Sequence, residues 1–274
     1  MRQWALLISK ACLILILMLV PVAAQAVDWT EGFEYANDAA MRAVWSASQT
    51  DCTWGGPTPS STRAHTGAKS DKQTYRGVVG TDVGAGGCYM TRDPTARSEQ
   101  LYARWWMYLD AFTTGGGVGT KITRHEDTLP GYPGVWWNIS VSGYALQAHI
   151  EGIILDGGTQ DTAVVSGGVI PQNQWVCMET YLAMGTPGVD DGTVRAWING
   201  TQVINKTNQR MRAATLNQQN GPNVKFGRVK LYTQHGLGVI YYDDYAVSRD
   251  ARIGCPAGGS DTTAPATPTG WLLQ

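Results

Sequence analysis

The segment 99–109, EQLYARWWMYL, alternates almost without interruption between two kinds of side chain. Side chains on a β-strand point to opposite faces with a period of two, so this pattern predicts a strand with one buried face. The face expected in the core carries Leu101, Ala103, Trp105, Met107 and Leu109. The opposite face, which we expect to look outward, carries Gln100, Tyr102, Arg104, Trp106 and Tyr108.

A face of aromatic rings with an arginine among them suits a sugar polymer. Rings stack on the flat faces of pyranoses, and a guanidinium pairs bidentately with a carboxylate. Tyr102 and Trp106 are therefore candidate binding residues, and Arg104 is a candidate partner for an acidic sugar. The alternative is the exposed face of an ordinary β-sandwich, which this strand fits equally well.

Most of the remaining chain also reads as strands between Gly, Pro and Asn turns. The segments 135–142 and 144–151 alternate on either side of Ser142-Gly143 and predict a hairpin, and Asn199-Gly200 predicts another tight turn. Only the segment 37–44 predicts a short helix, with Asn37 or Asp38 as its cap. The polar faces of the predicted strands carry Trp136, Asn138, Gln147, His149, Lys230, Tyr232 and Gln234.

Residues 1–26 have the features of an export signal. Arg2 and Lys10 supply positive charge, the run 11–20 is apolar, and Ala24-Gln25-Ala26 is a typical cleavage site. We expect one domain over residues 27–255 and a linker-like tail over residues 256–274. The protein is therefore expected to be secreted, to the extracellular space or the periplasm.

Charge and cysteine content narrow the function classes. The net charge is −1, which gives neither the basic footprint of nucleic-acid binding nor a polybasic membrane patch. We expect a monomer with a polysaccharide partner. Beyond the signal, the four cysteines favour two disulfides in an exported protein; of three possible pairings we favour Cys52–Cys88 and Cys177–Cys255.

Three stretches resemble a known superfamily. They are 101–110, then QWVCMETYLAMGTPGVDDGTVRAWING over 174–200, and YYDDYAVSRDARIG over 241–254. Together they resemble the concanavalin A-like lectin/glucanase jelly roll, near its secreted bacterial polysaccharide lyases. The resemblance implies an all-β sandwich of two antiparallel sheets, one of them bent into a groove.

A weaker resemblance connects the chain to alginate lyases of the jelly-roll type. Their motifs run R-S-E-L-R, Q-x-H and K-x-G-x-Y-x-Q, and this chain has Arg97-Ser98-Glu99, Gln147-Ala148-His149 and 230–234 in the same order. Two positions depart from the pattern: Leu101 replaces the second arginine, and no glycine lies between Lys230 and Tyr232.

β-Elimination on a uronic acid polymer needs three groups: one to neutralise the carboxylate, a base and an acid. We assign neutralisation to Arg104, Asn138 or Gln147, the base to His149 and the acid to Tyr232. A binding module without catalysis, using Tyr102, Trp106, Trp136 and Arg104, is the alternative, and an adhesive surface module is a third option. Hydrolysis is disfavoured because the paired carboxylates of jelly-roll glucanases, E-x-D-x-x-E, are missing.

Many relatives of this fold hold a structural Ca²⁺ between the first and last strands. The matching positions here are Glu31 or Glu34 and Asp243; alternation over 239–247 places Asp243 with Tyr241 and Tyr245, toward an apolar layer. A buried carboxylate needs a metal or hydrogen-bond donors, so backbone N–H groups are the alternative. We expect no organic cofactor.

The segment 121–127, KITRHED, is the densest charge cluster in the chain. We interpret it as a solvated loop. The alternative is that Lys121 and Arg124 flank an acidic glycan.

Overall fold

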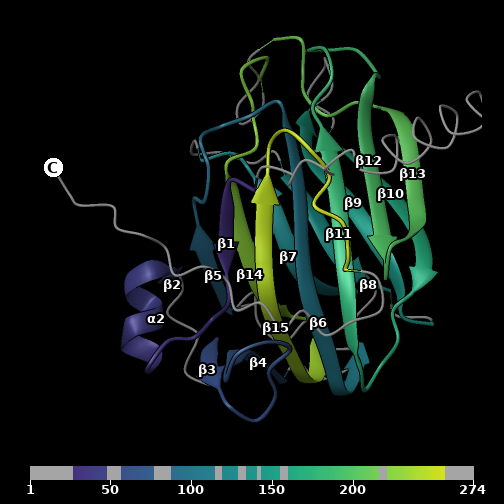
Figure 1. The fold of residues 1–274 in the computed structure, drawn as a ribbon. Coiled ribbons are helices and arrows are strands. Elements are labelled where there is room, and N and C mark those ends of the chain that lie inside the picture. The colour runs from purple at the N-terminus through teal and green to yellow at the C-terminus, as the bar shows by residue number, and fades with distance from the viewer. Residues whose placement is uncertain are drawn as a thin grey trace, which may run out of the picture.

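The computed structural model describes residues 27–47, 57–76, 88–114, 119–128, 134–140, 143–154, 160–215 and 221–256. The predicted signal, Cys52 and the tail beyond Pro256 lie outside these ranges. Two antiparallel sheets pack face to face, which confirms the predicted all-β jelly-roll sandwich (Figure 1). The domain limits themselves stay a prediction. Among the described residues, no helix is long and apolar enough to cross a membrane.

The first layer, sheet A, contains the strand that the alternating segment predicted. Its order is β13 (Thr201–Gln209), β12 (Gly192–Ile198), β11 (Trp175–Ala183), β6 (Gln100–Thr114), β15 (Gly236–Ser248), β4 (Ser70–Arg76) and β3 (Thr58–Ser60), with β1 (Trp29–Glu31) pairing with β15. In β6, the odd-numbered positions 101–109 are at most 2% exposed and belong to the core. Tyr102, Arg104 and Tyr108 face outward and are half-buried.

The second layer is sheet B. Its order is β10 (Gln160–Val169), β9 (Ala145–Ile154), β8 (Gly134–Ile139), β7 (Thr120–Glu126), β14 (Arg228–Gln234), β5 (Cys88–Arg92) and β2 (Ser46–Ala47). The predicted hairpin is confirmed, since β8 and β9 pair antiparallel with Trp136 opposite His149 and Asn138 opposite Gln147. Val135, Trp137, Ala148 and Leu231 point into the core, so their chain neighbours form the outer face.

Local sequence signals account for the helix and the tight turn. Helix α2 (Asp38–Val44) begins at Asn37, whose side-chain oxygen accepts a hydrogen bond from the N–H of Ala40 at 3.0 Å. Asn199 and Gly200 both have positive φ, 49° and 79°, as a type I′ turn between two strands requires. Both elements lie where the sequence predicts them.

The two sheets meet along one edge, where β10 packs against β13. A side chain at Gly167 would place its Cβ 2.1 Å from the carbonyl oxygen of Val203, so only glycine permits this approach. The contact closes the side of the sandwich that β10 and β13 share.

Two predictions about individual segments are wrong. The predicted loop 121–127 is the central strand β7, in which two polar residues, Thr123 and His125, point into the core. His125 accepts a hydrogen bond from Trp137 Nε1 (3.0 Å) and lies 2.8 Å from the Tyr245 hydroxyl, and burial lowers its pKa to about 3. A neutral histidine with a hydrogen-bond partner for each ring nitrogen therefore occupies an inward-facing position where alternation predicts an apolar residue.

The other error concerns which side chains of β15 point into the core. A register shift follows Asp243, and Asp244 has a φ of 46°, so the strand changes phase at this point. Tyr245 belongs to the core, whereas Asp243 pairs with Trp106 on the outer side of sheet A. Asp243 is nevertheless fully buried, because the chain at His65 and Thr66 covers it and donates two backbone N–H bonds.

Candidate functional site

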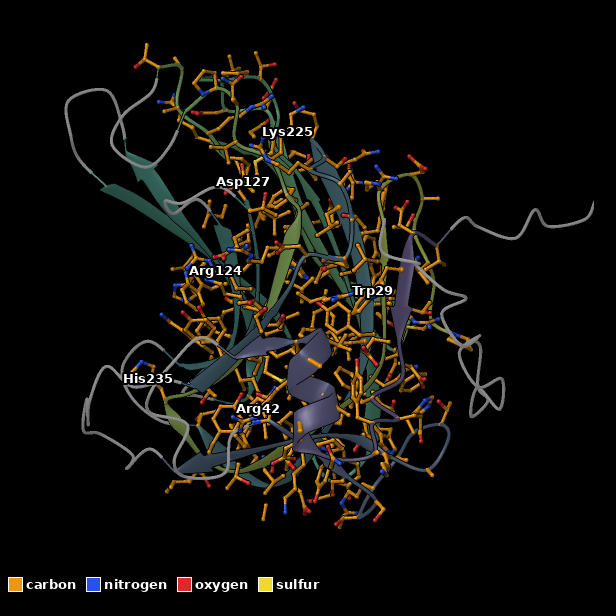
Figure 2. All side chains as sticks on the ribbon, turned by 90° about the vertical axis from the view of Figure 1, so that its left-hand side faces the viewer. Trp29, Arg42, Arg124, Asp127, Lys225 and His235 are labelled. Carbon is orange, nitrogen blue, oxygen red and sulfur yellow. A yellow bond between two sulfur atoms is a disulfide. The ribbon has the colours of Figure 1, made fainter. Side chains whose placement is uncertain are left out.

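The predicted site residues divide between opposite sides of the sandwich. Tyr102, Arg104 and Trp106 lie on the outer face of sheet A. Sheet B carries Trp136, Asn138, Gln147, His149, Lys230 and Tyr232 on its own outer face. The edge-on view of Figure 2 shows Arg124 of sheet B and Trp29 of sheet A on opposite sides. A single sugar cannot contact both sets, so Arg104 cannot share a catalytic centre with His149 or Tyr232.

On sheet A, the ring of Trp106 is already covered. His65 stacks on it with ring centroids 3.7 Å apart, and Trp106 is only 9% exposed. His65 is held in turn by Asp244, whose Oδ2 lies 2.6 Å from Nδ1. The prediction that Trp106 offers its face to a sugar is therefore wrong.

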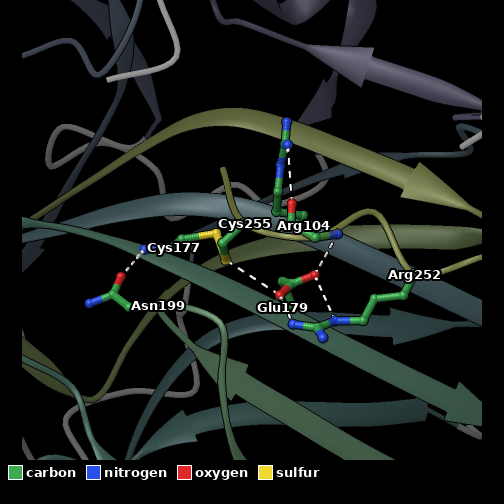
Figure 3. Close-up of a disulfide and its surroundings, with 7 residues drawn as sticks. Arg104, Cys177, Glu179, Asn199, Arg252 and Cys255 are labelled. Atoms are coloured by element: carbon green, nitrogen blue, oxygen red, sulfur yellow. Dashed lines mark hydrogen bonds and ion pairs between the residues drawn. A yellow bond between two sulfur atoms is a disulfide. The ribbon is translucent and has the colours of Figure 1, made fainter. Parts of the chain in front are cut away.

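The C-terminal segment covers the neighbouring part of sheet A (Figure 3). Arg104 donates a hydrogen bond to the carbonyl of Gly254 at 3.4 Å. Buried Glu179, its register partner on β11, accepts from the N–H of Gly254 (2.8 Å) and from the guanidinium of Arg252. The predicted disulfide Cys177–Cys255 fixes the same segment to the sheet. Cys88 begins β5, but its side chain and Cys52 lie outside the description, so that pairing stays a prediction.

Tyr102 also has a partner within the sheet. Its ring stacks on Tyr181 with centroids 4.4 Å apart, and the guanidinium of Arg195 lies 5.5 Å from the Tyr181 ring. These contacts fit an ordinary sandwich face, the alternative reading of the alternating segment.

On sheet B, the side chains gather around the ring of Trp136. The ammonium of Lys121 lies 3.7 Å from the ring centroid, and the guanidinium of Arg124 lies 4.2 Å from it. The ring of Tyr232 packs beside it at 4.5 Å. Two cations on one indole form a strongly electropositive aromatic centre.

Arg124 was named only in an alternative interpretation of the sequence, as a residue that flanks an acidic glycan together with Lys121. It is fully buried, pairs with Glu126 (Nε to Oε2, 3.0 Å) and runs along the backbone of Gly134. A Cβ at Gly134 would lie 2.5 Å from the Arg124 Nε, so this glycine makes room for the arginine. The register shift between Lys121 and Thr123 places Lys121 and Arg124 on the same face, although their numbers have opposite parity.

Lys230 extends the cationic centre onto β14. Its ammonium lies 2.6 Å from Glu126 Oε1 and 5.0 Å from the ring centroid of Tyr89. Tyr89 packs against Tyr232 at 5.2 Å, so the aromatic row continues to β5. Arg228 is held by two bonds to Asp93 at the same end.

The phenol of Tyr232 lies in this centre and is 5% exposed. Burial raises the pKa of Tyr232 well above its usual value, while the charge of Arg124 and a hydrogen bond with it act in the opposite direction. Tyr232 is therefore a protonated phenol beside a guanidinium at neutral pH. Such a group can donate a proton to a leaving oxygen.

His149 and Gln147 lie on the same face, at some distance from Tyr232. Strands β8 and β7 separate β9 from β14, which corresponds to about 14 Å between backbones at the usual strand spacing. The side chains of Trp136 and Arg124 lie in between. The predicted base and acid, His149 and Tyr232, are therefore not brought to the same glycosidic bond.

Three further candidates can be placed. Asn138 is buried between Lys121 and Gln147 in the register of the sheet, and Gln234 pairs with Lys121 at the backbone level. The R-S-E match lies outside this face: Arg97 makes a bidentate pair with buried Asp127, and Glu99 pairs with Arg212 at 2.7 Å. These residues connect loops at one end of the sandwich.

The residues matched to a calcium site already have hydrogen-bond donors. Glu31 accepts bonds from the N–H of Phe33 (2.8 Å), the hydroxyl of Tyr35 and the indole of Trp45. Glu34 accepts from the backbone of Ala68 and Lys69, and Asp243 accepts from that of His65, Thr66 and Asp244. No group of three or more His, Cys, Asp or Glu suited to a metal ion gathers in the described part of the chain. The donors fit the backbone alternative, and calcium binding stays a prediction.

No family model and no curated protein matches this chain. Among solved structures, the cellulose-induced protein Cip1 is 20% identical, with a TM-score of 0.54 over 83% of this chain and 99% of that one. An endo-β-1,4-glucuronan lyase from the fungus Trichoderma reesei is 13% identical, with a TM-score of 0.57 over 87% and 100%. A marine PL-14 alginate lyase from Aplysia kurodai is 11% identical, with a TM-score of 0.56 over 81% and 99%. At these identities the likeness shows the fold, a jelly-roll sandwich of two antiparallel sheets.

Proposed function

We propose that this protein is secreted, binds an acidic polysaccharide on the outer face of sheet B, and cleaves it by β-elimination. The observation that carries the proposal is the cluster of Arg124, Lys121 and Lys230 around Trp136 and Tyr232. The export-like N-terminus and the disulfide agree with secretion. Two of the solved structures with this fold are lyases of uronic acid polymers, which supports the same class of reaction.

The proposed reaction removes one proton from the polysaccharide and donates another to its leaving oxygen. A base removes the proton from C5 of a uronate, the C5–H electron pair forms a C4=C5 double bond, and the C4–O bond to the preceding sugar breaks. Half-buried Lys121 contacts the carboxylate, and the buried guanidinium of Arg124 on the same Trp136 ring adds its positive charge, so that both stabilise the carbanionic charge. From the sequence alone, this role was assigned to Arg104, Asn138 or Gln147. Tyr232 delivers a proton to the leaving oxygen. The base must act on the same sugar as Tyr232, so we assign it to Tyr89, whose ring packs beside Tyr232. Lys230 is an ammonium paired with Glu126 and serves as a cation, and His149 is left a binding role.

The test is an ultraviolet assay for the unsaturated chain end on alginate, glucuronan and hyaluronan. Tyr232→Phe keeps the ring packed on Trp136 but removes the proton donor, and we expect kcat to fall about 10²- to 10⁴-fold. Tyr102→Phe is the matched control on sheet A and should leave kcat unchanged. If the intact protein forms no unsaturated product from any of the three polymers, the lyase proposal is overturned.

Binding without catalysis is the second candidate, and one observation favours it. The groups that would react are almost enclosed, since Arg124 is fully buried and Tyr232 nearly so, whereas Lys121, Tyr89 and His149 are half-buried. If the protein only binds the polymer, neither the intact protein nor Tyr232→Phe cleaves it, and the two proteins bind it with the same Kd. Calorimetric titration of both proteins separates this outcome from a lyase.

A further inference from the structure

Side chains on the outer face of sheet B form two rows that run across the strands. Register partners extend from β5 through β14, β7, β8 and β9 to β10. Six strands at the usual spacing give a row about 24 Å long, longer than one sugar ring. One row of register partners contains Thr91, Lys230, Arg124, Trp136, His149 and Val164. The other contains Lys121, Asn138, Gln147 and Ser166 on β7 to β10, and a register shift in β14 separates it from the pair Tyr232 and Tyr89.

Positive charge is confined to one half of these rows. Strands β7 and β14 supply Lys121, Arg124, Arg228 and Lys230, which outnumber their acidic partners there, Glu126 and Asp93. Strands β9 and β10 contain neither lysine nor arginine anywhere in their sequences, and they carry the acids Glu151 and Asp161. The internal segments outside the description, 48–56, 77–87, 115–118, 129–133, 141–142, 155–159 and 216–220, contain no lysine or arginine either.

The β9–β10 half, which has no cations, presents a surface of different chemistry. Val164, the register partner of His149, is 51% exposed, and Ser166, the partner of Gln147, is exposed as well. An apolar methyl surface with hydroxyl, amide and imidazole groups suits a neutral sugar. A carboxylate placed here would lose water without gaining a cation, which is unfavourable.

Resting on the proposed function, we infer that the substrate is a heteropolysaccharide in which a uronate is followed by a neutral sugar. The uronate lies on the β7–β14 half, against Lys121 and Lys230, and its neutral neighbour lies on the β9–β10 half, against His149 and Val164. A polymer made only of uronates would place its second carboxylate over the β9–β10 half, where no lysine or arginine can pair with it.

The experiment compares glucuronan, in which every residue is a uronate, with hyaluronan, in which glucuronate alternates with a neutral N-acetylhexosamine. Cleavage and binding are both measured on the full chain. We expect kcat/KM, or the association constant, to favour hyaluronan by about tenfold or more, since the second carboxylate of glucuronan finds no cation on the β9–β10 half. Equal or better use of glucuronan overturns the inference while leaving the lyase proposal intact.

A positive charge added to the β9–β10 half gives a second measurement. Ser166→Lys places a cation beside Gln147, and we expect the ratio of glucuronan to hyaluronan activity to rise about two- to fivefold. Asn205→Lys is the matched control, because it adds the same charge at an exposed position on β13 of sheet A. No change in the ratio with Ser166→Lys, or an equal change with Asn205→Lys, overturns the inference.

The two proposals fail in different ways. If hyaluronan is bound more tightly than glucuronan but neither of them nor alginate is cleaved, the lyase proposal falls and the charge argument stands. If neither polymer is bound or cleaved, both fall.

Discussion

The outer faces of sheets A and B are built from the same kinds of residue, aromatic rings with arginine among them. On sheet A, other parts of the chain use these groups: His65 covers Trp106, and the segment fixed by the Cys177–Cys255 disulfide covers Arg104. On sheet B, the cations pack on the rings of Trp136 and Tyr89, with Glu126 as the acid among them. A strand face with aromatic rings and arginine therefore identifies an outer face of the sandwich. Contacts with distant segments of the chain then decide whether that outer face is available to a ligand.

Replacing the buried arginine on sheet B is the most direct way to break this comparison. Lysine at Arg124 keeps a charge but loses the planar fork that packs on Trp136 and can pair with a carboxylate. For Arg124→Lys we expect kcat/KM on a uronate polymer to fall about 10²- to 10³-fold, or about 3–4 kcal/mol of transition-state stabilisation. Steady-state kinetics in the ultraviolet assay measures this change.

Arg195→Lys is the corresponding control on sheet A, where the guanidinium lies near the ring of Tyr181. It should leave kcat/KM within about twofold of the unsubstituted protein. An equal loss in both variants would mean that the two faces are not functionally different.

Removing the disulfide tests sheet A by stability. Cys177 and Cys255 are 78 residues apart, and a bridge over such a loop contributes about 2–4 kcal/mol to the free energy of unfolding. We expect Cys177→Ser with Cys255→Ser to lose about that much in urea unfolding. Activity measured well below the Tm should be retained, and its loss there would assign sheet A a part in the function.

Much of the fold follows from local patterns in the sequence. The strict alternation over 101–109, the Asn37 cap and the Asn199-Gly200 turn are short-range signals, and each of these elements forms where it was expected. The pairing Cys177–Cys255 was also predicted correctly. Which side of each strand points into the core is set by burial of its apolar side chains, and the alternation within a single strand already shows which side that is.

The candidate site could be predicted only in part. Trp136, Lys230 and Tyr232 were found because they lie on polar faces of clearly alternating strands. Arg124 was named only in an alternative, and its segment was interpreted as a loop, because inward-facing His125 and the register shift in β7 remove the alternation that marks a strand. Contacts between segments far apart in the sequence, such as His65 on Trp106, have no local signal.

Gly134→Ala sharpens the comparison by disturbing Arg124 without changing any charge. The added Cβ would lie 2.5 Å from the Arg124 Nε and 2.9 Å from the His125 carbonyl oxygen, so the arginine must move. We expect a loss of about 1–3 kcal/mol in stability, as for other overpacked sites, together with a fall in kcat. If the fall acts through Arg124, the double variant with Arg124→Lys will lose less than the sum of the two single effects; additive losses would contradict this route.

The smallest effect we predict concerns the inward side of sheet A. Burial raises the pKa of Asp71 on β4 to about 8, nearby Glu31 and Asp38 raise it further, and a hydrogen bond from the Gln73 amide (2.7 Å) opposes the shift. The folded protein therefore holds a proton that the unfolded chain has lost between about pH 4 and pH 8, so the free energy of unfolding falls as pH rises through this window. Asp71→Asn removes the charge, and we expect it to be more stable than the unsubstituted protein by about 1 kcal/mol at pH 8 and by less at pH 5.

Urea unfolding at both pH values measures the difference, and lyase or binding activity on sheet B should not change. Equal stabilities at pH 8 would show that Asp71 is already satisfied as a carboxylate, and a change in activity would contradict a purely structural role for sheet A.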